Sequence, residues 1–233
     1  MTSDSSTPNS ADNQLALSVS LVLFGYDGRQ LQLVLSRRSK TPFDGELALP
    51  GRILEPNEKP EETAQAMMES ITGLSNIYHK QVRVFADPER HPSGRVVSIA
   101  YYGLIRRDQV KLQDSEAGMF PRWHNMADLP ILPFDHNDIV RSSYRRVRHR
   151  FRRKPIAVEL LPEIFTLGDL QQLFEVVLGR EFDKRNFQRR MKRSGLVKPV
   201  GLRKEPILGR PAKLYQTDPD RYHELRQQSE PFI

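Results

Sequence analysis

The segment between Phe165 and Tyr215 constrains the fold most strongly, because it predicts two short helices followed by a basic hairpin. Apolar residues recur at helical spacing across 167–178, which predicts a first helix with one apolar face. Thr166 precedes this helix as an N-cap candidate, and Asp169 stands three residues later, at the position that a capping box fills. Gly179 is well placed to end the helix.

A second helix is predicted to start after Asp183 and to end at Gly195. Phe187 and Met191 give it a narrow apolar face, while most other positions carry Lys, Arg, Asn or Gln. Such a helix fits the major groove of B-DNA, where Arg, Asn and Gln read base edges and Lys and Arg neutralise phosphates. The alternative is a solvated amphipathic helix with an ordinary charged face.

The next segment predicts a β-hairpin with strands at 196–202 and 212–215 and a basic tip that contains Gly-Arg-Pro. An arginine at such a tip suits a minor groove. Helix, turn, basic helix and basic hairpin together form the layout of a winged helix-turn-helix. This combination favours DNA binding over the solvated alternative.

The candidates for DNA contact differ in their expected roles. Positions four apart share a helix face, and the residues predicted to face the groove are Arg185, Asn186, Arg189 and Arg190. The predicted phosphate contacts are Lys192, Arg193, Arg203, Lys204 and Lys213. Arg210 is the predicted wing-tip residue, and Lys184 is a further candidate for DNA contact.

Charge is distributed unevenly along the 233 residues. Residues 1–140 hold 14 Lys and Arg against 18 Asp and Glu, a net charge of −4, whereas residues 141–233 hold 22 against 11, a net charge of +11. An acidic partner is therefore expected to dock on the C-terminal part.

Composition also bears on compartment and on covalent chemistry. No apolar run reaches the roughly 20 residues of a membrane-spanning helix, and no signal-peptide pattern opens the chain. The absence of cysteine excludes disulfides and thiolate metal sites. We expect a cytoplasmic protein without a membrane partner.

The N-terminal part predicts an α+β domain. Its strand signals lie at 15–26, 30–36, 82–86 and 96–105, with a helix signal at 59–71. Asp135 is an N-cap candidate for a very basic helix that runs to about Phe151 and bridges two domains. The expected organisation is a disordered tail at 1–14, one domain at 15–150 and a second at 151–233.

The stretch from Leu49 to Leu74 resembles the Nudix box, in which carboxylates of active hydrolases bind Mg²⁺ beside a nucleotide diphosphate. The matching residues are Pro50, Gly51, Glu58, Met68, Gly73 and Leu74. The departures are Arg52 at the first glycine, Ala66 and Met67 at Arg-Glu, and Ser70 and Ile71 at Glu-Glu. Methionine and isoleucine cannot bind Mg²⁺, which requires oxygen ligands. The resemblance thus predicts the fold without the hydrolase chemistry.

From about Leu17 to Tyr215, the chain resembles the Nudix-related transcriptional regulators of bacterial NAD metabolism, the NrtR family. The segments that carry this resemblance include LVLSRR, PFDGELALPG, PFDH, FTLGDLQQLFEVVLGR, DKRNFQRR and GRPAKLY. It implies a Nudix-like α/β/α sandwich with a mixed sheet, followed by a winged helix-turn-helix. It also implies a homodimer on palindromic operator DNA that represses genes of NAD synthesis and salvage.

In that family the Nudix-like domain binds a nucleotide, typically ADP-ribose, and the binding changes the affinity for DNA. The resemblance implies no catalytic residue, no metal and no cofactor. Two alternatives stay open: a regulator with a different or lost effector, and an active ADP-ribose pyrophosphatase. The second requires carboxylates that the box lacks.

The effector candidates are Arg37, Arg38, Phe43, Arg52, Glu58 and Arg95. Arg37 and Arg38 either bind the nucleotide or form an exposed charge pair, and Phe43 either stacks on a base or packs in the core. Arg52 either supplies the charge of the missing metal or blocks the old site.

The other candidates carry weaker signals. Glu58 lacks the other carboxylates of a metal site, and Arg95 at a strand start is a weaker phosphate candidate. Asp135 is expected to cap a helix, and His136 to pack between the domains.

Overall fold

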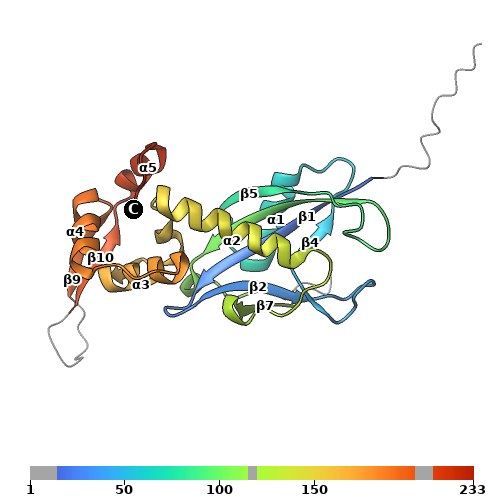
Figure 1. Ribbon diagram of the computed structural model, residues 1–233, viewed down its shortest axis with the longest axis horizontal. Helices are drawn as coiled ribbons and strands as arrows, with labels where there is room; N and C mark the ends of the chain where they lie inside the picture. The colour runs from blue at the N-terminus through green and yellow to red at the C-terminus, as the bar shows by residue number, and fades with distance from the viewer. Residues whose placement is uncertain (1–14, 115–119, 203–211) are drawn as a thin grey trace, which may run out of the picture.

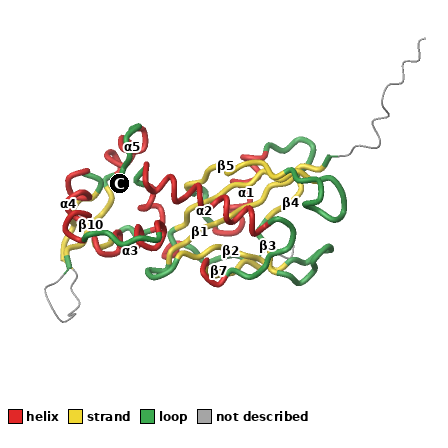
Figure 2. The backbone as a smooth tube through the Cα atoms, in the orientation of Figure 1, coloured by secondary structure: helices red, strands yellow, loops and turns green. Residues whose placement is uncertain are grey.

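The computed structural model describes residues 15–114, 120–202 and 212–233 (Figure 1). A mixed sheet with helices on both faces forms the N-terminal part, and a smaller unit of helices with a three-stranded sheet forms the C-terminal part (Figure 2). The long helix α2 (His136–Arg153) joins the two parts. The tail predicted at 1–14 lies outside the described residues.

In the described part of the chain, the N-terminal sheet contains seven strands: β1 (Ala16–Tyr26), β2 (Leu31–Arg37), β3 (Leu47–Ala48), β4 (Gly51–Ile53), β5 (Tyr78–Phe85), β6 (Val96–Ile105) and β7 (Phe120–Asn125). Their order is β3-β2-β1-β6-β5, with β4 paired to β1 and β7 paired to β2. The central strands β1 and β6 run parallel, and every other described pair is antiparallel. The prediction of a mixed sheet is therefore confirmed.

Helices cover both faces of this sheet, and their buried residues follow from that arrangement. Helix α1 (Pro60–Thr72) packs Met67, Met68 and Ile71 against the β1 face that carries Leu21. Helix α2 covers the opposite face. Because both faces are covered, β1 reads as an almost continuous apolar run instead of an alternating strand.

The C-terminal unit follows a short 3-10 helix at Ile156–Leu160. Its elements are β8 (Ile164–Thr166), α3 (Leu167–Leu178), α4 (Lys184–Ser194), β9 (Val197–Leu202), β10 (Lys213–Thr217) and α5 (Pro219–Gln227). The three strands form an antiparallel sheet in the order β8-β10-β9. This is the predicted winged helix-turn-helix.

Local sequence signals set the helix ends in this unit. The predicted capping box is present, because Thr166 N donates to the Asp169 carboxylate (2.8 Å) and Asp169 N donates to the Thr166 hydroxyl (3.1 Å). Such caps contribute about 1 kcal/mol each. Gly179 and Gly195 end α3 and α4 in the left-handed conformation, with φ of 65° and 73°.

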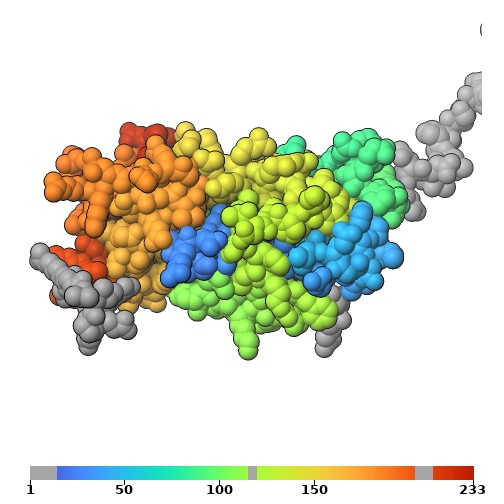
Figure 3. Space-filling model, turned by 60° about the horizontal axis from the view of Figure 1, so that its bottom comes forward, coloured from blue at the N-terminus to red at the C-terminus, as the bar shows by residue number. Residues whose placement is uncertain are grey.

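The two parts share one hydrophobic core. Phe151 of α2 and Phe174 of α3 belong to the same buried cluster as Leu33 of β2. Two hydrogen bonds reinforce the contact, from the Tyr144 hydroxyl to Val177 O (3.0 Å) and from Arg148 Nη2 to Leu178 O (2.7 Å). In Figure 3 the turn between β1 and β2 (blue) lies directly beside the winged unit (orange).

Several elements differ from expectation. The strand predicted at 82–86 begins earlier, at Tyr78, because β5 is an edge strand whose exposed residues break the apolar pattern. Strand β8 and helix α5 were not predicted. Helix α5 buries only Tyr222 and Leu225 of its nine residues, so its periodicity is weak, although Asp218-Pro219 is a recognisable helix start. Within the described residues, no helix is long and apolar enough to span a membrane.

Candidate nucleic-acid interface and ligand site

Helix α4 presents a basic outer face because its apolar residues fix the opposite side. Phe187 and Met191 are buried, at 3% and 0% exposure, against the rest of the C-terminal unit. The Asp183 carboxylate caps the helix by accepting from Asn186 N at 2.8 Å. The exposed side chains of the helix include Lys184, Arg185, Asn186, Arg189, Lys192 and Arg193.

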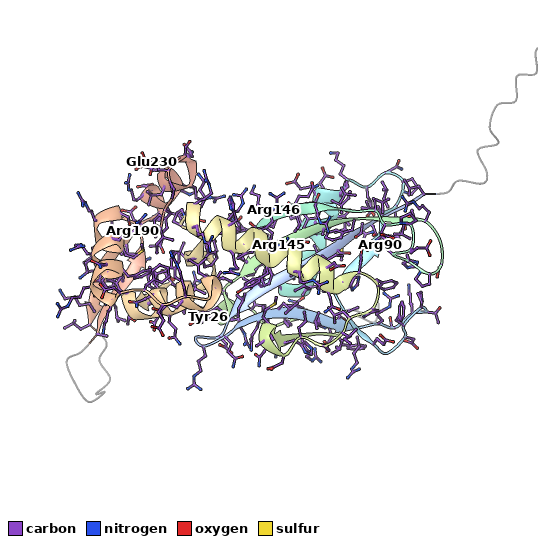
Figure 4. All side chains as sticks on the ribbon, viewed as in Figure 1. Tyr26, Arg90, Arg145, Arg146, Arg190 and Glu230 are labelled. Atoms are coloured by element: carbon purple, nitrogen blue, oxygen red, sulfur yellow. The ribbon has the colours of Figure 1, made fainter. Side chains whose placement is uncertain are left out.

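Two of the predicted groove-facing residues touch each other. Arg189 Nη2 donates to Asn186 Oδ1 at 2.7 Å, which places a guanidinium and an amide side by side on the outer face. Arg190 is engaged elsewhere. Its Nε donates to Phe232 O at 2.9 Å and its Nη2 to Pro231 O at 3.5 Å. Figure 4 labels Arg190 in this part of the molecule.

The hairpin of β9 and β10 follows α4 directly. Lys213 begins β10 opposite Leu202 and is exposed, as expected for a wing residue. The predicted contacts Arg203, Lys204 and Arg210 lie outside the described residues. The described part of the interface is therefore the outer face of α4 with the base of the wing.

In the N-terminal domain, the rings around Phe134 form a cluster that includes two predicted effector residues. The Arg38 guanidinium lies 4.9 Å from the centre of the Phe134 ring, and the Phe43 ring meets it edge-on at 4.8 Å. His91 stacks on the same ring at 4.9 Å. Arg38 Nε also donates to Pro42 O (2.8 Å), so the guanidinium holds the loop that carries Phe43.

Beside this cluster, the start of α2 is fixed by a buried histidine and an ion pair. Leu49 N donates to His136 Nδ1 at 3.1 Å. Burial, together with the positive charges of Arg90 and Arg38, lowers the pKa of His136 to about 3, so the ring is neutral and can accept. His136 is buried, but the prediction that it packs between the domains is wrong, because its hydrogen bond and its ring contact both lie within the N-terminal domain. Asp135 occupies the N-cap position of α2 as predicted, but its carboxylate makes no cap bond and instead binds Arg90 at 2.7 and 2.9 Å.

Arg37 has other neighbours than Arg38. It lies opposite Leu47 on one neighbouring strand and opposite Phe120 on the other. A hollow of about 350 Å³ at this place is lined by Arg37, Leu47, Phe120, Arg122, Trp123 and His124. Arg37 Nη1 donates to Gly45 O (2.9 Å), in the loop that also carries Phe43. The two predicted arginines therefore flank one loop.

Within the Nudix-like box, the two charged residues satisfy each other. The Arg52 guanidinium binds both oxygens of Glu58, at 2.5 and 2.6 Å. This contact, helped by the Glu55 amide, lowers the pKa of Glu58 to about 2. Glu58 is thus a carboxylate neutralised by a guanidinium.

The positions at which the box requires carboxylates do not fit a metal site. Met67 and Ile71 lie one helical turn apart and are 5% and 2% exposed, within the core between α1 and the sheet. Ala66 and Ser70 are exposed and offer no carboxylate. Mg²⁺ needs several oxygen ligands, and the described residues contain no group of three or more His, Cys, Asp or Glu that could hold a metal ion.

The remaining effector candidate is Arg95, and several residues of the site were not predicted. Arg95 is exposed, and its Nη1 donates to Ala86 O (2.9 Å), which closes its own loop. The new residues are the ring partners Phe134 and His91 and the hollow's Phe120 and Trp123. Phe134 stands in the PFDH segment, which the sequence makes visible, whereas nothing local links Phe120 to Arg37.

Comparison with known proteins relates both domains to described families. The model of the NrtR DNA-binding winged helix domain matches residues 157–217, and that of the NUDIX domain matches residues 14–147. The ADPR responsive transcriptional repressor NtrR of Acinetobacter baylyi is 33% identical over 205 residues, which are 86% of this chain and 81% of that protein.

Solved structures of NrtR from Shewanella oneidensis are also similar. Its complex with a 27mer DNA is 30% identical, with a TM-score of 0.78, over 89% of this chain and 95% of that chain. Its NUDIX domain in complex with ADP ribose is 28% identical, with a TM-score of 0.52, over 58% of this chain and 90% of that chain. An ADP-ribose pyrophosphatase of Methanocaldococcus jannaschii is 30% identical over 134 residues, 57% of this chain and 77% of that protein.

Proposed function

The chain belongs to the NrtR family through both its Nudix domain and its winged helix, and we propose that it is a DNA-binding transcriptional repressor controlled by ADP-ribose. The observation that carries this proposal is the outer face of α4, whose cations have no carboxylate partner among the described residues. Exposed cations of this kind bind the phosphates and the base edges of DNA. We therefore term α4 the recognition helix.

On DNA, the recognition helix enters the major groove with Arg185, Asn186 and Arg189 toward the bases. The bond between Arg189 and Asn186 supports this assignment, because it prepares both side chains on one face. Phosphates are contacted by Lys184, Lys192, Arg193 and Lys213, together with Arg203 and Lys204, while Arg210 reaches the minor groove. A homodimer presents two such helices to the half-sites of a palindromic operator.

ADP-ribose carries a pyrophosphate, an adenine and two ribose rings, so its site needs cations beside aromatic rings. We place it at the loop between β2 and β3, with the pyrophosphate at Arg37 and Arg38. Phe43, at 36% exposure, is available for stacking on the base. The Arg52–Glu58 pair and Arg95 are candidates for the ribose side of the same ligand.

The Nudix-like domain of this chain acts as a sensor and does not hydrolyse the nucleotide. The support is the donor set of α1, in which Met67 and Ile71 replace carboxylates and fill the core. Incubation of the purified protein with ADP-ribose and Mg²⁺ tests this statement. Release of AMP at a rate that depends on Mg²⁺ would contradict it.

A second candidate is a regulator of the same kind with a different nucleotide effector. It is favoured by Arg52, Met67 and Ile71, which change the charge and shape of the old substrate site. A thermal-shift titration with ADP-ribose, NAD and related nucleotides separates the two candidates, because a ligand of the native state raises apparent stability.

The decisive experiment measures binding to palindromic DNA from upstream of NAD synthesis and salvage genes, with and without ADP-ribose. We expect specific binding that weakens as ADP-ribose is added, because the ligand favours a dimer arrangement that no longer matches both half-sites. A repressor of this kind acts on the nucleoid in the bacterial cytoplasm. Binding that ignores ADP-ribose would favour the second candidate, and absence of specific binding would reject both.

A further inference from the structure

Residues 228–233 follow α5 and lie between the end of α2 and the recognition helix. Their backbone is held on the α2 side. Phe232 N and Ile233 N both donate to Arg152 O, at 2.9 and 3.0 Å. Arg153 Nη2 donates to Ser229 O at 3.3 Å, and Lys154 Nζ donates to Gln228 O. The last turn of α2 thus binds this segment along most of its length.

The same segment is bound from the other side by the recognition helix. Arg190 donates to the carbonyls of Phe232 and Pro231. The Phe232 ring is 8% exposed and stacks on Phe174, with ring centres 6.3 Å apart. Phe174 in turn meets Phe187 on the inner face of the recognition helix at 5.5 Å. The segment therefore connects α2 to the recognition helix by both backbone and side-chain contacts.

We propose that residues 228–233 form a strap that fastens the recognition helix to α2, and that Arg190 is a positioning residue acting through this strap instead of contacting DNA. This inference rests on the proposed function. It assigns Arg190 a role different from that of Arg189, its neighbour in sequence.

Helix geometry separates the two arginines. At 100° per residue, Arg189 lies about 160° from the buried Phe187, whereas Arg190 lies only about 60° from it. Arg189 therefore points outward, and Arg190 flanks the packed side, where the strap carbonyls accept its Nε and Nη2. A guanidinium fixed by two carbonyls on this side contributes to the orientation of the helix.

The strap matters for control because α2 begins in the sensor domain. Its first residues are fixed by the His136 and Asp135 contacts beside Arg38, and its last residues hold the strap. A displacement of α2 by the effector is thereby passed to the recognition helix as a change in position. Loosening the strap should weaken this coupling as well as the binding of DNA.

A direct phosphate contact is the competing role for Arg190. A hollow of about 500 Å³ beside the strap is lined in part by Arg153, Arg190 and Arg193, and three guanidinium groups suit a phosphate. Arg193 has no hydrogen bond or ion pair among the described residues, so it serves as the matched control for such a contact.

The first test compares Arg190→Ala, Phe232→Ala and the double variant, with Arg189→Ala and Arg193→Ala as controls. Operator affinity is measured across salt concentrations. We expect Arg190→Ala and Phe232→Ala each to lower specific affinity about tenfold, and the double variant to lose no more than either one. The slope of log affinity against log salt concentration should stay at the wild-type value for Arg190→Ala and Phe232→Ala. Arg193→Ala should lower the magnitude of this slope by about 1. The proposal would be overturned if the affinity loss of the double variant equalled the product of the two single losses. A lower salt slope for Arg190→Ala would overturn it as well.

The second test measures how far ADP-ribose weakens operator binding, as the ratio of the two dissociation constants. Arg190→Ala should bring this ratio toward one, whereas Arg189→Ala should lower affinity and leave the ratio unchanged. An unchanged ratio in Arg190→Ala would count against transmission through the strap.

The third test needs no DNA or nucleotide, so it stands even if the proposed function fails. Amide hydrogen exchange should show Phe232 and Ile233 protected in the full chain, at least about tenfold less protected in Arg190→Ala, and unaffected in Arg189→Ala. Unprotected amides in the wild type, or unchanged protection in Arg190→Ala, would reject the strap. Thermal unfolding of each variant confirms that the fold is retained.

Discussion

Helices α1 and α4 both lie at the position of a functional motif, but they differ in their charged residues. Helix α1 lacks the carboxylates of its motif, whereas α4 carries exposed cations. In α1 the motif's inward positions carry Met67 and Ile71, which are core residues. In α4 the outward positions carry Arg185 and Arg189, which form no ion pair with a carboxylate in the described part of the chain. A helix without functional charges still builds the fold, whereas unpaired charges on a surface indicate a partner. The comparison supports the proposal that the N-terminal domain has no hydrolase activity and that α4 binds DNA.

The largest effect is expected from Met67→Glu, which restores a carboxylate of the Nudix-like box in α1 and so tests its difference from α4. Because Met67 lies in the core, we expect a loss of at least about 3 kcal/mol in unfolding free energy, as a buried unpaired charge is costly. Urea unfolding at pH 7 measures it, with the exposed Ala66→Glu as the matched control. A stable Met67→Glu variant that hydrolyses ADP-ribose with Mg²⁺ would show that this position still faces a metal site.

The sensor domain should also respond to pH through His136, whereas α4 has no comparable buried group. The native pKa of about 3 lies below the ordinary value of 6.5, so the native ring stays neutral while the unfolded chain takes up a proton. Stability contributed by this group is present above pH 6.5 and falls on acidification, by about 3 kcal/mol between pH 6.5 and 4. Unfolding of wild type and His136→Gln across this range measures the difference, and parallel curves would contradict the assignment.

On the DNA side, Arg189→Ala should cost about 1–3 kcal/mol of specific binding and relax discrimination between operator and random DNA. Arg193→Ala should weaken binding to both DNAs alike, because a phosphate contact carries no sequence information. Fluorescence anisotropy with the two DNAs separates these patterns. Equal losses on both DNAs for Arg189→Ala would reassign that residue to the phosphates.

The smallest expected effect concerns the remaining charges of the box. Arg52→Ala removes the guanidinium bound to Glu58, so the pKa of Glu58 should rise from about 2 toward its ordinary value of 4.5. NMR titration of the Glu58 carboxyl measures this change, with Lys59→Ala as a control at an exposed neighbouring cation. A pKa that stays near 2 without Arg52 would assign the shift to the Glu55 amide.

Much of the fold was predictable because its signals are local. The capping box at Thr166, the left-handed glycines 179 and 195, and the turn before β2 each depend on a few neighbouring residues. The box alignment likewise identified Met67 and Ile71 as departures from residue type alone. The edge strand β5 and helix α5 escaped prediction, since each buries few residues and so shows little periodicity.

The candidate sites were only partly predictable. Residue type and helix phase placed Arg189 on the outer face, but the same reasoning placed Arg190 beside it. Its actual acceptors lie about 40 residues away, in a segment with no helix or strand signal. Arg37 and Arg38, adjacent in sequence, make different contacts, because Arg37 lines the hollow with Phe120 whereas Arg38 lies over the Phe134 ring.

The sequence by itself determined the two domains, the loss of the metal-binding carboxylates and the basic outer face of α4, because each follows from residue type at a fixed local spacing. The tertiary structure alone decided that Phe134 gathers Arg38, Phe43 and His91, and that Arg152 and Arg190 meet on the strap. Those contacts join side chains and carbonyls from distant segments. The free energy of these contacts depends on which surfaces become neighbours when the chain packs. No local sequence pattern specifies those neighbours.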